Sequence, residues 1–502
     1  MSTAAVERGS SQPRTEFVRA ITLTDATMLV AGTMIGSGIF IVSSDMSRGL
    51  GSPFWLLIAW IATGVITLFG ALSYGELAAM FPRAGGQYVF LRESLGPLMG
   101  FLYGWTLFVV IQTGTIAAVA VAFGKFLGVI WPAISPDRYG WFPQFDFTSQ
   151  GSLIQVGLSP ERLIALISIW ALTWVNLRGV KTGKTVQTLL TMVKIAALVL
   201  LIIFGLTIGR NATALLANFG PGNFAPHVDL TSAFVLAFGA ALVGSLFSSD
   251  SWNNVTFAAA EVQNPKRNIP LALALGTGIV TVLYVLANVA YLNVLPLMGH
   301  QGAADLMGRG IQYATQDRVG TAAAQVIFGA SGGIIMAILI LISTFGCNNG
   351  LILSGPRVYW AMAKDRLFFK KIGTLNAREV PAAALIVQAV WASLLCLTGT
   401  YSQLLDFVIF AGLLFYVSTT LGLFILRVKR PDVERPYRAF GYPIVPALYI
   451  LSASAIAVVL LIAGKTRTQA ISGLVLVLIG VPIYFVWRSV EGNRSSAADV
   501  RE

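Results

Sequence analysis

The 502-residue chain has few charged side chains and few of the residues that build metal or catalytic centres. Asp, Glu, Lys and Arg make up 11% of it, whereas soluble domains carry about a quarter. Two histidines and two cysteines supply neither a ligand cluster nor a disulfide framework. The shortage of charge excludes an ordinary soluble domain. We expect no enzyme activity, metal ion or cofactor, and we expect Cys347 and Cys396 to be buried free thiols.

Apolar residues are abundant instead. They form 56% of the chain, and the mean hydropathy is +0.76. Stretches with little charge that can cross a hydrocarbon core of ~30 Å recur twelve times. The pattern predicts an all-α membrane protein with twelve transmembrane helices. The predicted spans are residues 22–44, 53–80, 97–131, 163–177, 186–208, 233–260, 269–297, 325–354, 381–399, 404–428, 445–463 and 471–487.

The positive charge is distributed unevenly along the chain. The net charge is +12, and with the N-terminus inside, 24 of the 34 Lys and Arg residues fall in inward loops and tails but 8 in outward loops. This asymmetry sets membrane orientation, so it accounts for the basicity without a nucleic-acid partner. We expect a multi-pass protein of the cell (inner) membrane with both termini in the cytoplasm. The residues before Arg19 contain no apolar core of a cleaved signal peptide.

Glycine and serine interrupt the middle of the first span. Gly36, Ser37 and Gly38 would leave backbone groups unpaired at a depth where lipid cannot bond them. Residues 246–254 form a second break, because Asp250 and several serines and asparagines lie inside the otherwise apolar sixth span. Close helix packing would explain the glycines alone. Two breaks one half-repeat apart predict an inverted repeat of five plus five helices with broken helices 1 and 6.

The predicted repeat divides the chain into four parts. Residues 1–20 form a cytoplasmic N-terminal tail, and residues 21–430 form a ten-helix transport core of helices 1–5 and 6–10. Residues 431–488 add helices 11 and 12, and residues 489–502 form a cytoplasmic C-terminal tail. Residue identities show no repeat, so the division depends on the paired breaks.

Four groups of motifs are spread from the first span to the eleventh. They are GTMIGSGIF at 32–40; SYGEL at 73–77, FPRAGGQY at 81–88 and LYGW at 102–105; WN at 252–253, Glu261, NP at 264–265 and RNIP at 267–270; and STFG at 343–346, residues 357–366, RPYR at 435–438 and GYP at 441–443. Together they resemble the amino acid–polyamine–organocation (APC) superfamily of transporters, and within it the L-type amino acid transporter (LAT) family. The resemblance implies the leucine-transporter fold, with substrate held between unwound parts of spans 1 and 6. It also implies secondary active transport or exchange of L-amino acids by alternating access.

An amino acid needs hydrogen-bond donors for its carboxylate and acceptors for its ammonium group, and a broken helix offers both from its backbone. We expect the N–H groups of residues 37–39, at the positive end of a half-helix, to face the carboxylate. Carbonyls around Ile35 and Phe247 would accept from the ammonium group. The predicted substrate-binding residues are Ile35, Gly36, Ser37, Gly38, Ile39, Phe247, Ser248, Ser249 and Asp250.

Lys194 lies in the middle of the fifth span, too deep for its ammonium group to reach water, so we expect it to face the interior and pair. In sodium-coupled relatives the comparable place holds a cation between spans 1 and 8, and the resemblance implies that Lys194 substitutes for it. Lys194 would then reach the carbonyl region of Gly36 and Ser343 on span 8, act in coupling or gating, and make transport sodium-independent. A purely structural lysine bonded to carbonyls is the alternative.

Asp250 departs from the small residues that are common at this break in the family. Its carboxylate would hold the side-chain cation of a lysine-like or arginine-like substrate, join two helices, or pair with a lysine of the protein. Because no second charge accompanies it, we expect neutral substrates with some tolerance of cationic ones. Glu76 and Asp406 lie at span ends, where solvated or interfacial positions are expected.

Other classes of function fit the residues less well. Residues 329–333 match a nucleophile elbow, but no histidine lies at membrane depth near Ser331. Residues 179–185 fail the spacing of a phosphate loop because position 178 is an arginine. Two alternatives remain: a membrane sensor that binds an amino acid without moving it, and a polyamine or organic-cation transporter of the same fold.

The partners expected from the sequence are an amino acid substrate and the lipid bilayer. Animal L-type transporters are joined to a single-span glycoprotein through a cysteine between spans 3 and 4. Residues 132–161 contain no cysteine, so we expect no disulfide-linked heavy chain and a stand-alone bacterial protein. The substrate side chain, the choice between exchange and proton-coupled uptake, and the oligomeric state are left open by the sequence.

Overall fold

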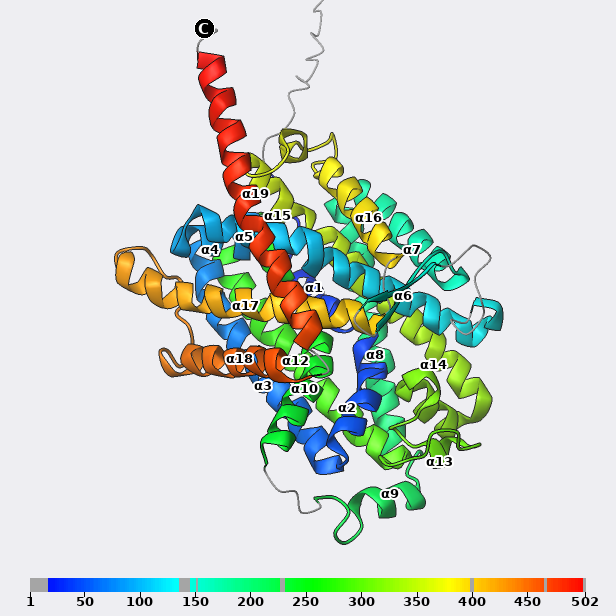
Figure 1. Cartoon of the computed structure of the whole chain (residues 1–502). Helices are drawn as coiled ribbons and strands as arrows, with labels where there is room; N and C mark the ends of the chain where they lie inside the picture. The colour runs from blue at the N-terminus through cyan, green and yellow to red at the C-terminus, as the bar shows by residue number, and fades with distance from the viewer. Residues whose placement is uncertain are drawn as a thin grey trace, which may run out of the picture.

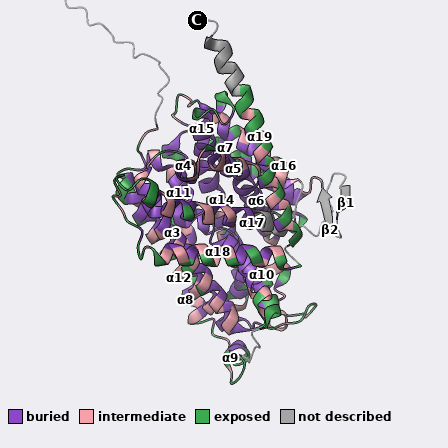
Figure 2. Cartoon of the chain, turned by 60° about the vertical axis from the view of Figure 1, so that its left-hand side comes forward, coloured by how far each residue is buried: buried purple, intermediate pink, exposed green. Residues whose placement is uncertain are grey.

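A computed structural model describes residues 17–134, 145–149, 152–225, 231–397, 401–464 and 467–499. Helices form almost all of it and pack around a buried interior (Figure 1). Figure 2 shows that buried residues fill the middle of the molecule, whereas exposed residues lie on the outer faces of peripheral helices. Many of these outer residues are large and apolar; Leu189 is 61% and Leu451 66% exposed. Apolar outer faces are what helices present to lipid.

Among the described residues, eight helical stretches are long and apolar enough to cross a membrane. They are α3 (Pro53–Met80), the continuous Pro97–Ile130, α8 (Val180–Leu206), α12 (Pro265–Val294), the continuous Val319–Lys364, Val408–Lys429, α18 (Ile444–Ile462) and Arg467–Val490. Within these, α5 is Pro97–Thr106, α6 is Gln112–Ile130, α14 is Val319–Ser354 and α15 is Pro356–Lys364, while α17 is Tyr401–Lys429 and α19 is Arg467–Asp499. A π-helical turn, Leu107–Ile111, joins α5 to α6.

The remaining helices are shorter. They are α1 (Leu23–Met34), α2 (Val42–Leu50), α4 (Gln87–Leu95), α7 (Pro160–Leu177), α9 (Ala212–Phe219), α10 (Ser232–Ser248), α11 (Asn254–Phe257), α13 (Leu306–Arg309) and α16 (Ala382–Cys396). In Figure 1, α9 and α13 lie at the end of the molecule opposite to the C-terminal end of α19. One antiparallel hairpin, β1 (Phe145–Ser149) with β2 (Ser152–Val156), lies between α6 and α7.

The helical membrane architecture predicted from the sequence is therefore present, whereas the count of twelve spans stays a prediction. The four other predicted spans coincide with α1 and α2, with α7, with α10 and α11, and with α16. Two of them are split by breaks, α16 has only 15 residues, and α7 carries Glu161 and Arg162 in its first turn. Length and composition alone do not assign such helices to the bilayer.

Local sequence explains where several helices begin. Thr22 and Asp25 form a capping box before α1: the Asp25 N–H donates to Thr22 Oγ1 at 3.2 Å, and the Thr22 N–H donates to the Asp25 carboxylate at 3.1 Å. Proline occupies the first position of α3, α7 and α12, where its missing N–H has no helical partner to lose.

Of the two positions expected for Glu76, solvated or interfacial, the structure contradicts the solvated one. Its side chain is fully buried, and Arg427 donates to both carboxylate oxygens, at 3.0 and 2.6 Å. The Ala439 N–H donates to the same carboxylate at 2.7 Å. A charged residue at the end of an apolar helix looks the same in sequence whether water or a remote arginine covers it, which is why the expectation failed. The side chain of Asp406 lies outside the described residues.

A second buried ion pair lies at the start of α15. Arg357 Nε donates to Glu261 Oε1 at 2.7 Å, and neither side chain is more than 2% exposed. The chain before α1 runs beside Glu261, because the Ile21 N–H donates to the Glu261 carbonyl and the Gln263 N–H donates to the Ile21 carbonyl, both at 2.9 Å. Figure 1 places α15 toward the end of the molecule from which α19 projects. This pair fastens the segment after α11 to the segment after α14.

Candidate functional site

The candidate site starts where α1 ends. Between Met34 and Val42 the chain forms only one short 3₁₀ turn, Gly38–Phe40. Within the described ranges, the N–H groups of Gly38 and Ile39 donate to no backbone carbonyl. Buried backbone donors are costly unless they find an acceptor. An anionic ligand would supply that acceptor.

The sixth predicted span is also interrupted, and the two interruptions touch. α10 ends at Ser248 and α11 begins at Asn254, with Ser251 between them at a φ of +67°. The Thr33 hydroxyl at the end of α1 donates to the Ser251 carbonyl at 3.0 Å. A Cβ atom on Gly38 would overlap Ser248 Oγ and lie 2.8 Å from Ser248 Cβ. Glycine at position 38 therefore allows the two breaks to lie against each other.

Lys194 of α8 lies against the first break. Its buried Nζ donates to the carbonyls of Gly32, Ile35 and Ser343 at 2.5, 2.8 and 3.3 Å. Within the described residues no carboxylate forms an ion pair with it, so its charge is balanced by carbonyl dipoles at the C-terminal end of α1. The Gly36 carbonyl, which the sequence placed near Lys194, accepts from the Ser343 hydroxyl at 3.2 Å.

The carbonyl groups expected to bind the substrate's ammonium group differ in how many hydrogen bonds they already accept. The Ile35 carbonyl accepts from Lys194 at 2.8 Å and lies 3.2 Å from the Ser343 hydroxyl, whose single proton it shares with the Gly36 carbonyl. The Ser248 carbonyl accepts from the Tyr284 hydroxyl at 3.0 Å and keeps one lone pair. Ser248 is therefore the better acceptor for a substrate ammonium group.

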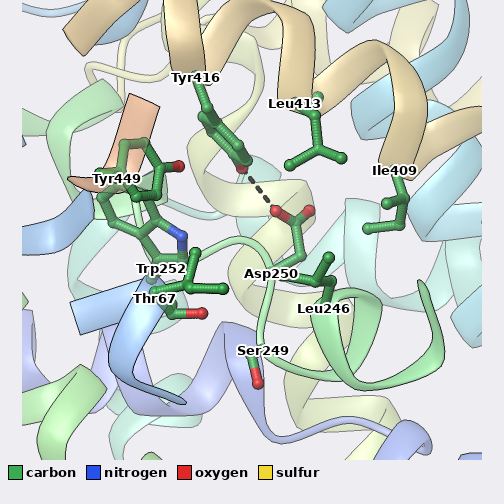
Figure 3. A pocket seen from close by; sticks show the side chains of 11 residues that line it. Thr67, Leu246, Ser249, Asp250, Trp252, Ile409, Leu413, Tyr416 and Tyr449 are labelled. Atoms are coloured by element: carbon green, nitrogen blue, oxygen red, sulfur yellow. Dashed lines mark hydrogen bonds between the residues drawn. The ribbon is translucent and has the colours of Figure 1, made fainter. Parts of the chain in front are cut away.

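Asp250 lies in the second break and faces a cavity between α3, α10, α17 and α18. The cavity encloses about 380 Å³ of space between atoms, its open side included. Figure 3 shows the carboxylate pointing toward Tyr416, with Leu413 on one side and Trp252 on the other. The Tyr416 hydroxyl donates to Asp250 Oδ1 at 2.5 Å, and the Ser251 hydroxyl lies 3.4 Å from Oδ2. No lysine or arginine of the described chain pairs with Asp250.

The sequence profile of the amino acid permease family matches residues 21–484, which is nearly the whole chain. The chain belongs to this family. The match confirms the resemblance to the APC superfamily, and the family consists of transport proteins rather than enzymes.

Named relatives of this permease are transporters as well. The serine/threonine exchanger SteT of Bacillus subtilis (strain 168) is 31% identical over 474 residues, which cover 93% of the permease and 96% of SteT. The human large neutral amino acids transporter small subunit 2 is 30% identical, covering 97% of the permease and 83% of that protein. The human b(0,+)-type amino acid transporter 1 is 27% identical, with 95% and 90% covered.

A second cavity of the permease shares Asp250, Gly412 and Tyr416 with the first. Its wall combines the π-helical turn Leu107–Ile111 with Gln87, Asp250 and Asn253. Asn253 Nδ2 donates to Gln87 Oε1 at 2.7 Å, which ties the second break to the first turn of α4. A π-helical turn often marks a functional segment. Asp250 therefore borders both cavities.

Sequence patterns did not point to Tyr416 or to the bond between Gln87 and Asn253. A single tyrosine in an apolar span and a glutamine after two glycines are common in membrane helices. Only the fold brings them to Asp250. The two cysteines of the permease are buried and free, as the sequence predicted. No group of three or more His, Cys, Asp or Glu side chains suited to a metal occurs in the described part of the chain.

Proposed function

We propose that this permease moves L-amino acids across the cytoplasmic membrane as a sodium-independent secondary transporter or exchanger. The observation that carries the proposal is the contact of two interrupted helices at Gly38 and Ser248. Beside this contact, two backbone N–H groups find no backbone acceptor in the part of the chain that the structure describes. The substrate carboxylate would accept from the N–H groups of residues 37–39, at the start of the 3₁₀ turn that leads into α2. The Ser248 carbonyl would accept from the ammonium group.

Neutral amino acids are the proposed main substrates. Among the described residues, Asp250 is the only carboxylate that lines the two cavities, and Tyr416 already donates to it at 2.5 Å. Apolar side chains such as Leu413 and Ile409 form much of the first cavity. The printed names of two relatives, a serine/threonine exchanger and a large neutral amino acids transporter subunit, point the same way. Asp250 would allow some cationic substrates.

Alternating access supplies the mechanism. In the proposed five-plus-five repeat, broken helices 1 and 6 would move against the other helices and expose the site to each side in turn. Lys194 would take the place of a bound metal cation, because its ammonium group already occupies the carbonyls of Gly32, Ile35 and Ser343. The uneven Lys and Arg distribution supports an inner-membrane orientation with both termini in the cytoplasm.

The permease is proposed to work without a disulfide-linked heavy chain. No cysteine occurs in residues 132–161, the segment where the animal relatives would be joined to their partner. Both cysteines of the chain are buried, so neither is placed to form a bond with another protein.

Counterflow in liposomes tests the proposal. Purified protein is reconstituted in vesicles loaded with one unlabelled L-amino acid, and entry of the labelled amino acid is followed for each of the twenty in turn. We expect accumulation with neutral amino acids and none in vesicles without protein. Binding of an amino acid without counterflow would instead support a sensor. Counterflow of a polyamine but of no amino acid would support an organic-cation transporter.

A further inference from the structure

Helix α12 carries three buried hydrogen-bonding side chains on one face: Tyr284, Asn288 and Tyr291. Intervals of four and three residues place them on the same side of the helix, about one turn apart. None of the three is more than 1% exposed. Each of them contacts the interrupted first span or the residues at the ends of the two breaks. This face of α12 is therefore built against the substrate-binding segment.

Tyr284 joins the two breaks. Its hydroxyl lies 3.0 Å from the Met34 carbonyl, at the end of α1, and 3.0 Å from the Ser248 carbonyl, at the end of α10. The single hydroxyl proton is shared between the carbonyls of these two helix ends, so Tyr284 is a donor that both ends have in common. The ring packs edge-on against Trp60, with 5.4 Å between ring centroids, which fixes the direction of the hydroxyl.

Asn288 and Tyr291 continue the row beyond the break. The Ser43 hydroxyl, in the first turn of α2, donates to Asn288 Oδ1 at 2.6 Å. Asn288 Nδ2 donates to the Tyr284 carbonyl at 2.8 Å, which sets the orientation of the amide. The Tyr291 hydroxyl donates to the Ile39 carbonyl at 3.4 Å.

These contacts hold both ends of the 3₁₀ turn that presents the free N–H groups. Met34 precedes the turn and Ile39 lies within it, and the carbonyl of each accepts from a tyrosine of α12. On the opposite side, Lys194 donates to the Ile35 carbonyl. Because a peptide unit is planar, these bonds fix the peptide planes that follow Met34, Ile35 and Ile39. The two peptide units that carry the Gly38 and Ile39 N–H groups lie between these fixed planes, so their freedom to rotate is reduced.

We propose that Tyr284, Asn288 and Tyr291 are positioning residues that keep the N–H groups of Gly38 and Ile39 directed at the substrate carboxylate. The identity of that ligand rests on the proposed function, whereas the positioning is a property of the empty protein. Preorganised donors bind an anion without first having to be ordered, so loss of the row weakens substrate binding. It leaves the later steps of transport intact.

Hydrogen exchange of the substrate-free protein tests the positioning directly. Full-length wild type, Tyr284→Phe and Tyr291→Phe are compared in lipid nanodiscs, and exchange is measured in peptides that cover residues 34–43. We expect exchange there to be at least about fivefold faster in both variants, because each loses one hydroxyl that anchors the turn. Tyr359→Phe is the matched control, since the Tyr359 hydroxyl is buried and has no hydrogen-bond partner within the described residues.

Transport supplies the second measurement. For an amino acid that wild type carries, we expect Tyr284→Phe to raise KM by about 3- to 10-fold, the effect of one hydrogen bond in a membrane protein, and to change kcat by less than about twofold. Unchanged exchange in both α12 variants overturns the inference. Faster exchange spread over the whole protein, with KM unchanged, also overturns it, because the hydroxyls would then be merely structural. Faster local exchange in a protein that carries no amino acid supports the inference and refutes the proposed function.

Discussion

Of the two glycines in the candidate site, Gly36 and Gly38, Gly38 has the less space for a side chain. A Cβ atom there would overlap Ser248 Oγ, so any side chain pushes the two breaks apart. We expect Gly38→Ala to lower uptake at least about tenfold and Gly38→Val to abolish it, because overpacking at a tight contact costs about 1–3 kcal/mol. Uptake by reconstituted protein, normalised to the amount of folded protein, measures both effects.

Two further variants make the Gly38 prediction specific. Gly49→Ala is the matched control, because a Cβ at Gly49 meets nothing within 4 Å. Adding Ser248→Gly to Gly38→Ala removes the side chain that the new methyl group meets, so we expect part of the activity to return. Normal uptake by folded Gly38→Val would contradict the assignment of the site.

The charge of Asp250 can be separated from its hydrogen bonds. Asp250→Asn keeps an acceptor for the Tyr416 hydroxyl but removes the negative charge. We expect arginine and lysine to compete for uptake about 10- to 100-fold less well in this variant, since a charge-assisted hydrogen bond contributes about 1–3 kcal/mol. Competition by leucine and alanine should change by less than about twofold. Equal losses for all four amino acids would show that Asp250 serves only as a link to Tyr416.

At the scale of the helices, the buried ion pair between Arg357 and Glu261 joins the start of α15 to the segment that follows α11. We expect Arg357→Gln to destabilise the protein by about 3–5 kcal/mol, because it leaves the Glu261 carboxylate buried without its partner. The measurement is the thermal unfolding temperature in detergent. Lys266→Gln is the matched control: its pair with Glu434 is exposed, with side chains 51% and 73% accessible, and should contribute less than about 1 kcal/mol.

A double variant distinguishes charge pairing from packing at this joint. With Arg357→Gln and Glu261→Gln together, no charge is left buried, so we expect much of the lost stability to return. If the loss of stability in the double variant equals the sum of the losses in the two single variants, the two side chains act independently. The ion pair then does not hold the two segments together.

For the whole molecule, the ion that drives transport follows from Lys194. Its ammonium group lies 2.5–3.3 Å from three carbonyl oxygens, which are the ligands that a sodium ion would need. We expect uptake at constant pH to change by less than about twofold when choline or potassium replaces sodium. Uptake into liposomes in the three salts measures this. A requirement for sodium would mean that Lys194 has another role.

Much of the molecule follows from the sequence alone. Long apolar segments require helices in a membrane, because only a helix satisfies its own backbone hydrogen bonds there. The two glycines and one serine at 36–38 and the polar residues within 246–254 interrupt those helices wherever the rest of the chain lies. The family motifs are also visible in the sequence, and the permease profile matches the residues that contain them. Helical class, the positions of the breaks and the family were therefore predictable.

The tertiary structure decided which groups meet. Tyr416 contacts Asp250 across 166 positions, Tyr284 reaches Met34 across 250, and Arg427 reaches Glu76 across 351. Local sequence carries no information about such distant partners. It therefore predicts neither the row on α12 nor the burial of Glu76, for which a solvated or interfacial position is the expectation. The spacing of apolar residues determines where a helix forms. The packing of remote helices determines which of its polar atoms are satisfied and which are left to bind a substrate.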